Sequence, residues 1–382
     1  MNNMQSQVSE TDQLHFCLHL CYSLAQASPA SSCLGESRPL TSIAAVGRRP
    51  PMAKVFITGA TGYVGGDALY HLSSAPANYD ISALVRGSEK ASVVQAAFPH
   101  IRVVQGDLDD AKLIEEEAKK ADIVLNLAAT NHVTSANAIA TSLNNAGKPV
   151  HWIQMSGATL FAADEIASRR FGQKSDKVYD DLEGVSEILS VISNSPSRTV
   201  DNLIIRQDPS KVKTALLVGP LIYGVGRGPG NQRSVQAPEI ARVTLKNKAG
   251  FKLEAGENAW SNIHVHDLSD LCLKLVEAAV AGKNGVWNQD GIYCPENGAM
   301  EFGKLSEGIA AEAAKQGLIP DGTVKKTISG DEADAESGHA SILWGTNAVQ
   351  KSSRARTKLK WQPSEVSLVE EIPNIVRIES EA

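Results

Sequence analysis

A short apolar run, three spaced glycines and a helical pattern follow one another between residues 55 and 72. Residues 55–58 are mostly branched and apolar, as in a buried strand. Gly59, Gly62 and Gly65 come next, and residues 67–72 then carry three apolar side chains on one helix face. A strand, a glycine turn and a helix in this order predict the phosphate-binding corner of a doubly wound sheet.

The spacing of the glycines assigns a different task to each of them. Gly59 allows a tight turn, Gly62 lets a pyrophosphate approach the backbone, and Gly65 lets helix and strand pack closely. The helix N-terminus offers free N–H groups and partial positive charge to the anion. We therefore expect a dinucleotide to contact Gly59, Thr61, Gly62, Tyr63, Val64 and Gly65. A glycine turn with a purely structural role is the alternative.

Apolar runs alternate with helical patterns along the rest of the chain. Strands are expected at residues 80–86, 101–105, 122–129, 151–157 and 213–218. Helices are expected at residues 109–120, 132–146, 268–281 and 302–315. Because the first part of this alternation has the spacing of βαβ units, the sheet should be parallel and the fold class α/β, of the Rossmann type.

The overall composition narrows the classes of function. The chain has 382 residues, of which 42 % are apolar and 21 % charged, as in ordinary globular proteins. A net charge of -6 argues against nucleic acid as a partner. No run approaches the roughly 18 apolar residues that would cross a bilayer. Only Cys272 and Cys294 follow the glycine turn, so we expect no disulfide framework and a reducing, cytoplasmic compartment.

Residues 1–51 differ from the rest in composition. They are rich in Ser, Ala, Gln and Asn and lack a regular apolar period. Residues 25–27 mimic a signal cleavage site, but no Lys or Arg precedes them. Met52 stands just before the first predicted strand. We expect residues 1–51 to be a disordered extension or the product of an over-long start-site assignment.

The end of the second predicted strand bears on the choice of cofactor. A cofactor without a 2′-phosphate usually meets an acidic residue there. This strand instead ends in Val85-Arg86, with Lys90 close behind and Glu89 as the only acid nearby. Because arginine can pair with a 2′-phosphate through charge-assisted hydrogen bonds, we expect NADP rather than NAD at Arg86. A solvated loop charge is the alternative for Arg86.

Acidic and small residues at two further strand ends extend the predicted cofactor site. Asp107, beside Leu108, follows the third strand, where a carboxylate could accept from the adenine amino group. Capping of the next helix is the alternative for Asp107, and the two roles are compatible. Ala128 and Ala129 end the fourth strand, and their small size would let the cofactor lie across it.

Together these motifs resemble the extended short-chain dehydrogenase/reductase family, which includes nucleotide-sugar epimerases and dehydratases. The resemblance runs from about Met52 to near the C-terminus. It implies that the cofactor is held by Gly59, Gly62, Gly65, Asp107, Ala128 and Ala129. It also implies a turn beside the nicotinamide at residues 219–224, where Pro220 would contact the cofactor.

The resemblance further implies how substrate is bound. Relatives often bind a substrate diphosphate with the loop that corresponds to residues 227–233, so Arg227 and Arg233 are candidate ligands together with Tyr223. Solvated arginines in a surface loop are the alternative.

The family pattern also implies the domain boundaries. We expect a cofactor domain at residues 52–223 and a mainly substrate-binding part at 224–382, with 256–287 returning to the Rossmann core. Residues 352–361 resemble the closing helix and turn of the family.

The catalytic set of the family is incomplete in this chain. Relatives use a Ser or Thr, a Tyr that acts as acid or base, and a Lys four residues later that lowers the pKa of the Tyr. Ser156 supplies the first member, and Tyr179 lies at a suitable interval, but Glu183 stands at the Lys position. In an equally good second register the catalytic helix spans residues 198–206, Ser197 and Asp201 stand at the Tyr and Lys positions, and both members are lost.

Three functions therefore remain open. The chain is a small-molecule oxidoreductase, a nucleotide-sugar epimerase or dehydratase with altered acid/base groups, or a non-catalytic sensor that binds NADP. For an oxidoreductase we expect Ser156 to orient the reacting oxygen and Tyr179 to donate the proton, with Tyr223 as the second choice. Without a lysine the phenol pKa should stay near about 10, which favours donation and hence reduction of a carbonyl with NADPH.

The remaining expectations concern metals and partners. His264 and His266 share one face of a short predicted strand, but no third ligand is evident in the sequence, so we expect no metal site. The expected partner is a small-molecule substrate, with neither nucleic acid nor membrane. The resemblance leaves a homodimer open.

Overall fold

A seven-stranded parallel sheet lies at the centre of residues 52–382, the part of the chain that the computed structural model describes. The strand order is β11-β7-β5-β4-β1-β2-β3, and every neighbouring pair is parallel. The strands are β1 Lys54–Thr58, β2 Asp80–Val85, β3 Arg102–Gln105, β4 Ile123–Asn126, β5 Val150–Gly157, β7 Val212–Gly219 and β11 Ile292–Tyr293. This arrangement confirms the predicted α/β fold of the Rossmann type.

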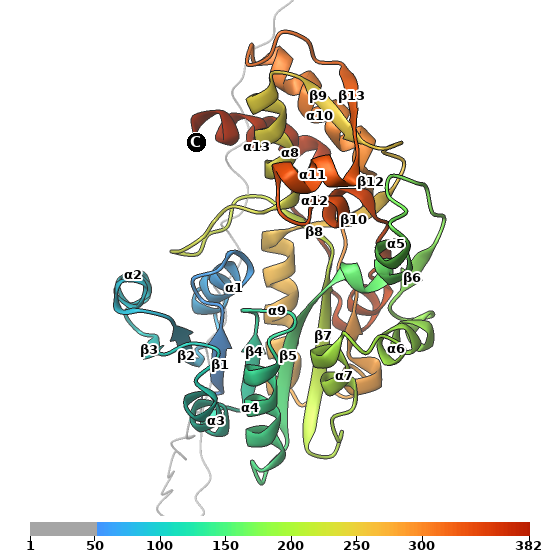
Figure 1. Ribbon diagram of the computed structural model, residues 1–382. Coiled ribbons are helices and arrows are strands. Elements are labelled where there is room, and N and C mark those ends of the chain that lie inside the picture. The colour runs from blue at the N-terminus through green and yellow to red at the C-terminus, as the bar shows by residue number, and fades with distance from the viewer. Residues whose placement is uncertain (1–51) are drawn as a thin grey trace, which may run out of the picture. The chain divides into compact units, whose positions relative to one another are not determined.

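Helices cover both faces of the sheet (Figure 1). One layer contains α1 Tyr63–Ser73, α2 Ser88–Ala97 and α9 Val265–Val280, with α1 and α9 packed on each other. The other layer contains α3 Ala111–Lys120, α4 Val133–Asn144, α6 Val185–Ser193 and α7 Thr199–Ile205. Because side chains alternate along a strand, Ile57 packs into the first layer and Phe56 into the second.

A group of smaller elements lies beyond the carboxyl ends of the large sheet (Figure 1). Three short sheets belong to it: β8 Leu221–Tyr223 with β10 Ala259–His264 and β12 Ala299–Glu301, β9 Gly250–Leu253 with β13 Val324–Ile328, and β6 Val178–Asp180 with β14 Val349–Lys351. Its helices are α5 Ala163–Ser168, α8 Gln236–Asn247, α10 Phe302–Lys315, α11 Gly330–Glu336, α12 Ala340–Gly345 and α13 Leu368–Glu381. Between these elements the chain returns to the large core through α9 and β11.

Several predicted elements have different ends in the structure. The fourth strand ends at Asn126, so Ala128 and Ala129 lie in the loop that follows it. Asp110 rather than Asp107 caps α3, by accepting a hydrogen bond from the Leu113 N–H. The segment expected to form a closing helix and turn is helical over residues 353–359, with Ala355–Leu359 in π-helical geometry, and Lys360 then adopts a left-handed conformation.

The expectations for membrane spans, cysteines and residues 1–51 are considered next. No helix within residues 52–382 is both long enough and apolar enough to cross a bilayer. Cys272 and Cys294 are buried free thiols. The expectation for residues 1–51 lies outside the described residues.

Candidate active site

Tight backbone contacts fix the turn between β1 and α1. Gly59 has a φ of +85°, in the left-handed region that favours glycine, and a Cβ there would lie 2.8 Å from the Ala128 nitrogen. A Cβ at Gly65 would overlap the carbonyl oxygen of Gly59. The packing of this turn on α1 and on the loop after β4 therefore requires glycine at both positions.

Gly62 has more room and lies at the start of the helix. A Cβ there would be 3.3 Å from the Gly59 carbonyl oxygen, which is tight without an overlap. Gly62 is the N-cap of α1, and no side chain caps this helix. The first N–H groups of α1 are thus left without a side-chain partner, and they carry the partial positive charge of the helix end. This corner has the shape and the donors that fit the pyrophosphate of a dinucleotide.

A buried chain of polar side chains links three neighbouring strand ends below this corner. The Thr58 hydroxyl donates to the Asn126 amide oxygen at 2.6 Å, and the Asn126 amide nitrogen donates to Gln154 at 2.8 Å. The Gln154 amide nitrogen then donates to the carbonyl of Ala129 at 3.1 Å. These bonds hold the small residues after β4 in place beside Gly59. This series of hydrogen-bonded side chains was not expected from the sequence. Its signal there is a polar residue near the end of three otherwise apolar strands.

The predicted contacts to the adenosine half lie at the ends of β2 and β3. Arg86 is exposed directly after β2, and it has no ion pair within residues 52–382. Asp107 is also exposed, and one of its carboxylate oxygens accepts from the Asp109 N–H at 2.9 Å. Leu108 packs against the core below. The structure thus leaves Arg86 accessible to a ligand, and its pairing with a 2′-phosphate stays a prediction.

The loop after β8 lies directly on the glycine corner. The Tyr63 hydroxyl donates to the Gly224 carbonyl at 2.7 Å, and the Asn231 N–H donates to the Thr61 carbonyl at 3.0 Å. A Cβ at Gly228 would overlap the backbone of Gly66. The loop can come this close only because glycines lie on both sides of the contact.

Both loop arginines are engaged by carboxylates of the chain itself. Arg227 donates from its backbone and from two guanidinium nitrogens to Asp67, at 2.7 to 3.0 Å. Burial raises the pKa of Asp67, but the hydrogen bonds from Arg227 more than offset it and hold the pKa below its ordinary value. Arg233 pairs with Glu379 and Glu239, each at 2.7 Å. A role of either arginine in binding a substrate diphosphate would require these ion pairs to open.

Ser156 lies at the end of β5, but it is buried under α7. Its hydroxyl donates to a carboxylate oxygen of Asp201 at 3.0 Å, and both residues are 1 % exposed. This contact favours the second register, in which Ser197 and Asp201 stand at the Tyr and Lys positions, so Tyr179 could act as an acid only from outside the family's tyrosine position. Burial raises the pKa of Asp201 to about 6, although Arg198 at 3.8 Å and the Ser156 hydroxyl act in the opposite direction. The other oxygen of Asp201 is buried without a hydrogen-bond partner.

Tyr179 lies in β6 and is half-buried. Its ring stacks on Phe161, with centroids 4.1 Å apart, and Phe161 belongs to the turn that follows β5. The Lys177 ammonium lies 5.2 Å from the ring centroid. Burial raises the pKa of Tyr179 above its ordinary value, while Lys177 opposes this change. The phenol is therefore protonated at neutral pH and can act as an acid.

Tyr223 lies in the protein core. It is fully buried, and its hydroxyl donates to the carbonyl of Val366 at 2.7 Å. Burial raises the pKa of Tyr223 well above its ordinary value. The expectation that Tyr223 contacts substrate or donates the reaction proton therefore does not fit this structure. Pro220, three residues earlier, is also buried.

The structure adds a carboxylate to the two histidines at the start of α9. His264, His266 and Glu365 place one ligand-type atom each within 4.8 Å of one another. Glu365 lies 3.1 Å from the His266 Nδ1, Val225 O lies 3.0 Å from its Nε2, and the His264 Nδ1 accepts from the His266 N–H. Burial lowers the pKa of His264 to about 4. These hydrogen bonds attach the loop after β8 to α9 and occupy both ring nitrogens of His266 and the Nδ1 of His264.

Comparison with known proteins decides the family. A protein of Acremonium sp. named oxidase ucsJ is 38 % identical over 341 residues, a match that covers 86 % of this chain and 98 % of that protein. Residues 51–178 match the NmrA-like family. The chain belongs to the NmrA-like family. This membership agrees with the predicted resemblance to extended short-chain dehydrogenase/reductases and with a Rossmann domain that binds NAD(P).

Solved structures show the same fold at low sequence identity. A dTDP-glucose 4,6-dehydratase from Bacillus anthracis, in complex with NAD, has a TM-score of 0.61 and 14 % identity over 86 % of this chain and 97 % of its own. The PbgP3 protein from Burkholderia pseudomallei has a TM-score of 0.61 and 16 % identity over 85 % of this chain and 96 % of its own. At these identities the likeness establishes the fold of this NmrA-like protein and nothing finer.

Proposed function

We propose that this NmrA-like protein is an NADP-dependent oxidoreductase that reduces a carbonyl group of a small molecule. The observation that carries the proposal is the corner at Gly59–Gly65, where the backbone packing requires glycine and the helix end offers uncapped N–H groups. The name of the Acremonium relative, an oxidase, supports the class of reaction. The exposed, unpaired Arg86 supports the choice of NADP.

The domain roles follow from the same geometry. We assign the cofactor to residues 52–223 and the substrate mainly to residues 224–382, because the smaller elements lie beyond the strand ends where ligands of open α/β sheets bind. The nicotinamide supplies the hydride when the cofactor is bound.

Tyr179 is the proposed proton donor. Burial raises the pKa of its phenol, so the phenol is protonated at neutral pH. A protonated phenol can donate its proton to the oxygen of a carbonyl that is being reduced. The hydroxyl proton of Ser156 is held by Asp201, so Ser156 can polarise a carbonyl only when Asp201 releases it. We therefore give Ser156 the role of a positioning residue at the end of β5.

The test is a panel of aldehydes and ketones with NADPH, run on the parent protein and on Tyr179→Phe. General acid catalysis typically contributes a factor of about 100 or more, so Tyr179→Phe should lose at least that much rate. Tyr79→Phe is the matched control, because Tyr79 lies directly before the amino end of β2, away from the carboxyl ends of the strands where ligands bind. Full activity in Tyr179→Phe would remove Tyr179 from the reaction.

A non-catalytic NADP sensor is the second candidate. Two contacts favour this candidate. The hydroxyls of Ser156 and Tyr223 both donate to acceptors of the protein itself, so neither is free to act on a substrate. Tight NADPH binding without turnover of any carbonyl would select the sensor. A nucleotide sugar bound to the purified protein would instead select an epimerase or dehydratase.

A further inference from the structure

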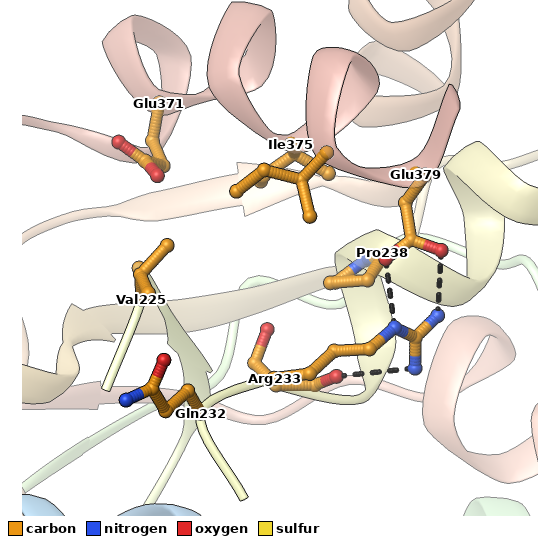
Figure 2. A pocket seen from close by; sticks show the side chains of 10 residues that line it. Val225, Gln232, Arg233, Pro238, Glu371, Ile375 and Glu379 are labelled. Atoms are coloured by element: carbon orange, nitrogen blue, oxygen red, sulfur yellow. Dashed lines mark hydrogen bonds and ion pairs between the residues drawn. The ribbon is translucent and has the colours of Figure 1, made fainter. Parts of the chain in front are cut away.

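A small cavity lies between the loop after β8 and the C-terminal helix α13. Its volume is about 170 Å³. The loop contributes Gly224, Val225 and residues 232–234, α8 contributes Pro238, and α13 contributes Glu371, Ile375, Ile378 and Glu379. Figure 2 shows the α13 side chains along one wall, with Val225, Gln232 and Arg233 facing them. We call this cavity the α13 recess.

The α13 wall has an apolar middle and an acidic group toward each end. Glu371, Ile375 and Glu379 are spaced four residues apart, which places them on one face of the helix. Figure 2 shows Ile375 between the two glutamates. A ligand in the α13 recess would therefore pack against Ile375 and reach a carboxylate at one end.

The two glutamates differ in their partners. Both oxygens of Glu379 accept from the Arg233 guanidinium, at 2.7 and 2.9 Å, so the charge at that end is neutralised. Glu371 accepts one hydrogen bond, at 2.7 Å from the amide of Asn374. Among residues 52–382 its second oxygen has no hydrogen-bond donor, and Glu371 forms no ion pair. Glu371 is 8 % exposed, and its second oxygen is not among the fully buried polar atoms that lack a partner, so water reaches this oxygen from the recess.

We propose that the α13 recess binds a small organic cation, an apolar ring that bears an ammonium group directed at Glu371. The size follows from the volume, because an apolar cavity of about 150 Å³ in another protein is known to hold a benzene ring. The charge follows from the unpaired carboxylate, since a charge-assisted hydrogen bond is roughly twice as strong as a neutral one. A neutral apolar ligand would displace water from that carboxylate without replacing its hydrogen bonds, and an anion would be repelled by it.

The α13 recess also borders the cofactor corner. Gly224 lines the recess, and its carbonyl accepts the hydrogen bond from Tyr63 at the start of α1. Arg233 and Val225 belong to the same loop, which lies on the glycine turn through Asn231 and Gly228. A ligand in the recess would thus sit against the loop that covers the cofactor corner. The inference goes beyond the proposed function, because it concerns binding and is independent of the reaction.

The experiment measures binding of three probes to the full chain by calorimetry, without added cofactor. Benzylamine should bind at least tenfold more tightly than benzyl alcohol, which has the same ring and no charge, and than benzoate. Glu371→Gln should reduce benzylamine to the level of benzyl alcohol. Glu381→Gln is the matched control, since Glu381 is exposed at the end of the same helix, and it should change nothing.

A second variant tests the location. Ile375→Trp should fill the α13 recess and abolish binding of benzylamine and benzyl alcohol alike. If Ile375→Trp does not fold, Val225→Trp does the same from the mouth, where the side chain is 40 % exposed. Equal affinities for benzylamine and benzyl alcohol, no binding of benzylamine at millimolar concentration, or unchanged binding in Glu371→Gln would overturn the proposal. Because no cofactor is present, a failure here is separate from a failure of the proposed reductase.

Discussion

The corner after β1 and the edge after β5 are built in opposite ways. At the corner, Gly59 and Gly65 bring backbone against backbone, and the groups that a ligand would meet are N–H groups of α1. At the β5 edge, the relevant groups are side chains, and Ser156 is joined to Asp201 under α7. The first region presents its polar groups to a ligand. In the second region, the Ser156 hydroxyl already donates its hydrogen bond to Asp201.

In the register that the Ser156–Asp201 contact favours, the resemblance places a lysine where this chain has Asp201. An ammonium at the position of Asp201 would lower the pKa of a neighbouring phenol, but the carboxylate accepts the serine hydroxyl instead. The glycine corner depends on no such side chain, because backbone contacts fix it. We therefore expect binding of a dinucleotide and chemistry on a substrate to be separable in this protein.

The largest effect is expected where backbone packing leaves no room. Gly65→Val should destabilise the fold by about 3–5 kcal/mol, because its Cβ would overlap the Gly59 carbonyl. Thermal unfolding measures this. Gly62→Val is the companion variant: it has more room, should keep most of the stability, and should weaken NADPH binding by blocking the pyrophosphate. Equal losses of stability in the two variants would contradict the claim that Gly62 has more room for a side chain than Gly65.

The next effect concerns the buried acid at the β5 edge. The pKa of Asp201 is about 6 in the folded state and about 3.9 when unfolded, so the folded state binds its proton more tightly. This contribution is fully present below about pH 4 and is lost as the pH rises through 6. Asp201→Asn cannot ionise, so between pH 4 and pH 7 the parent should lose roughly 2 kcal/mol relative to this variant.

Chemical denaturation of both proteins across this pH range makes the measurement. Asp80→Asn is the control, because Asp80 is exposed at the start of β2, forms no ion pair within residues 52–382 and should leave the pH profile unchanged. Parallel profiles for the parent and Asp201→Asn would mean that Asp201 is not a buried acid with a raised pKa.

The smallest expected effect concerns Arg86, at the adenosine end of the proposed cofactor site. Arg86→Ala should remove most of the preference for NADPH over NADH, by about 1–3 kcal/mol for a charge-assisted contact, and leave NADH binding unchanged. Titration with both cofactors measures it, with Lys90→Ala as a neighbouring charge control. Equal affinities for NADPH and NADH in the parent would show that Arg86 does not read the 2′-phosphate.

The sequence was informative where a residue type has a single structural use. Gly59 and Gly65 could be assigned because only glycine allows the positive φ or the close contact that this turn needs. Likewise, the apolar runs predicted the parallel sheet, since both faces of such a sheet are buried.

Side chains whose partners are distant in sequence could not be assigned. Tyr223 was expected at the nicotinamide, yet it faces Val366, and Arg227 was expected to meet substrate, yet it meets Asp67. Asp201 fits the same description, because only the fold shows that it reaches Ser156. The pattern of apolar and polar residues along the sequence shows which face of a helix or strand a side chain lies on. It does not show which distant residue that side chain will contact.

The contact between Arg227 and Asp67 joins residues that are 160 positions apart in the chain. During synthesis, β1 and α1 therefore leave the ribosome long before the loop that lies on them has been made. Contacts of such high sequence separation form late, because a long stretch of chain must first be ordered between their ends. The cofactor corner thus acquires its cover only after β7 has joined the sheet, and a nascent chain that stops before residue 224 would present the dinucleotide site uncovered.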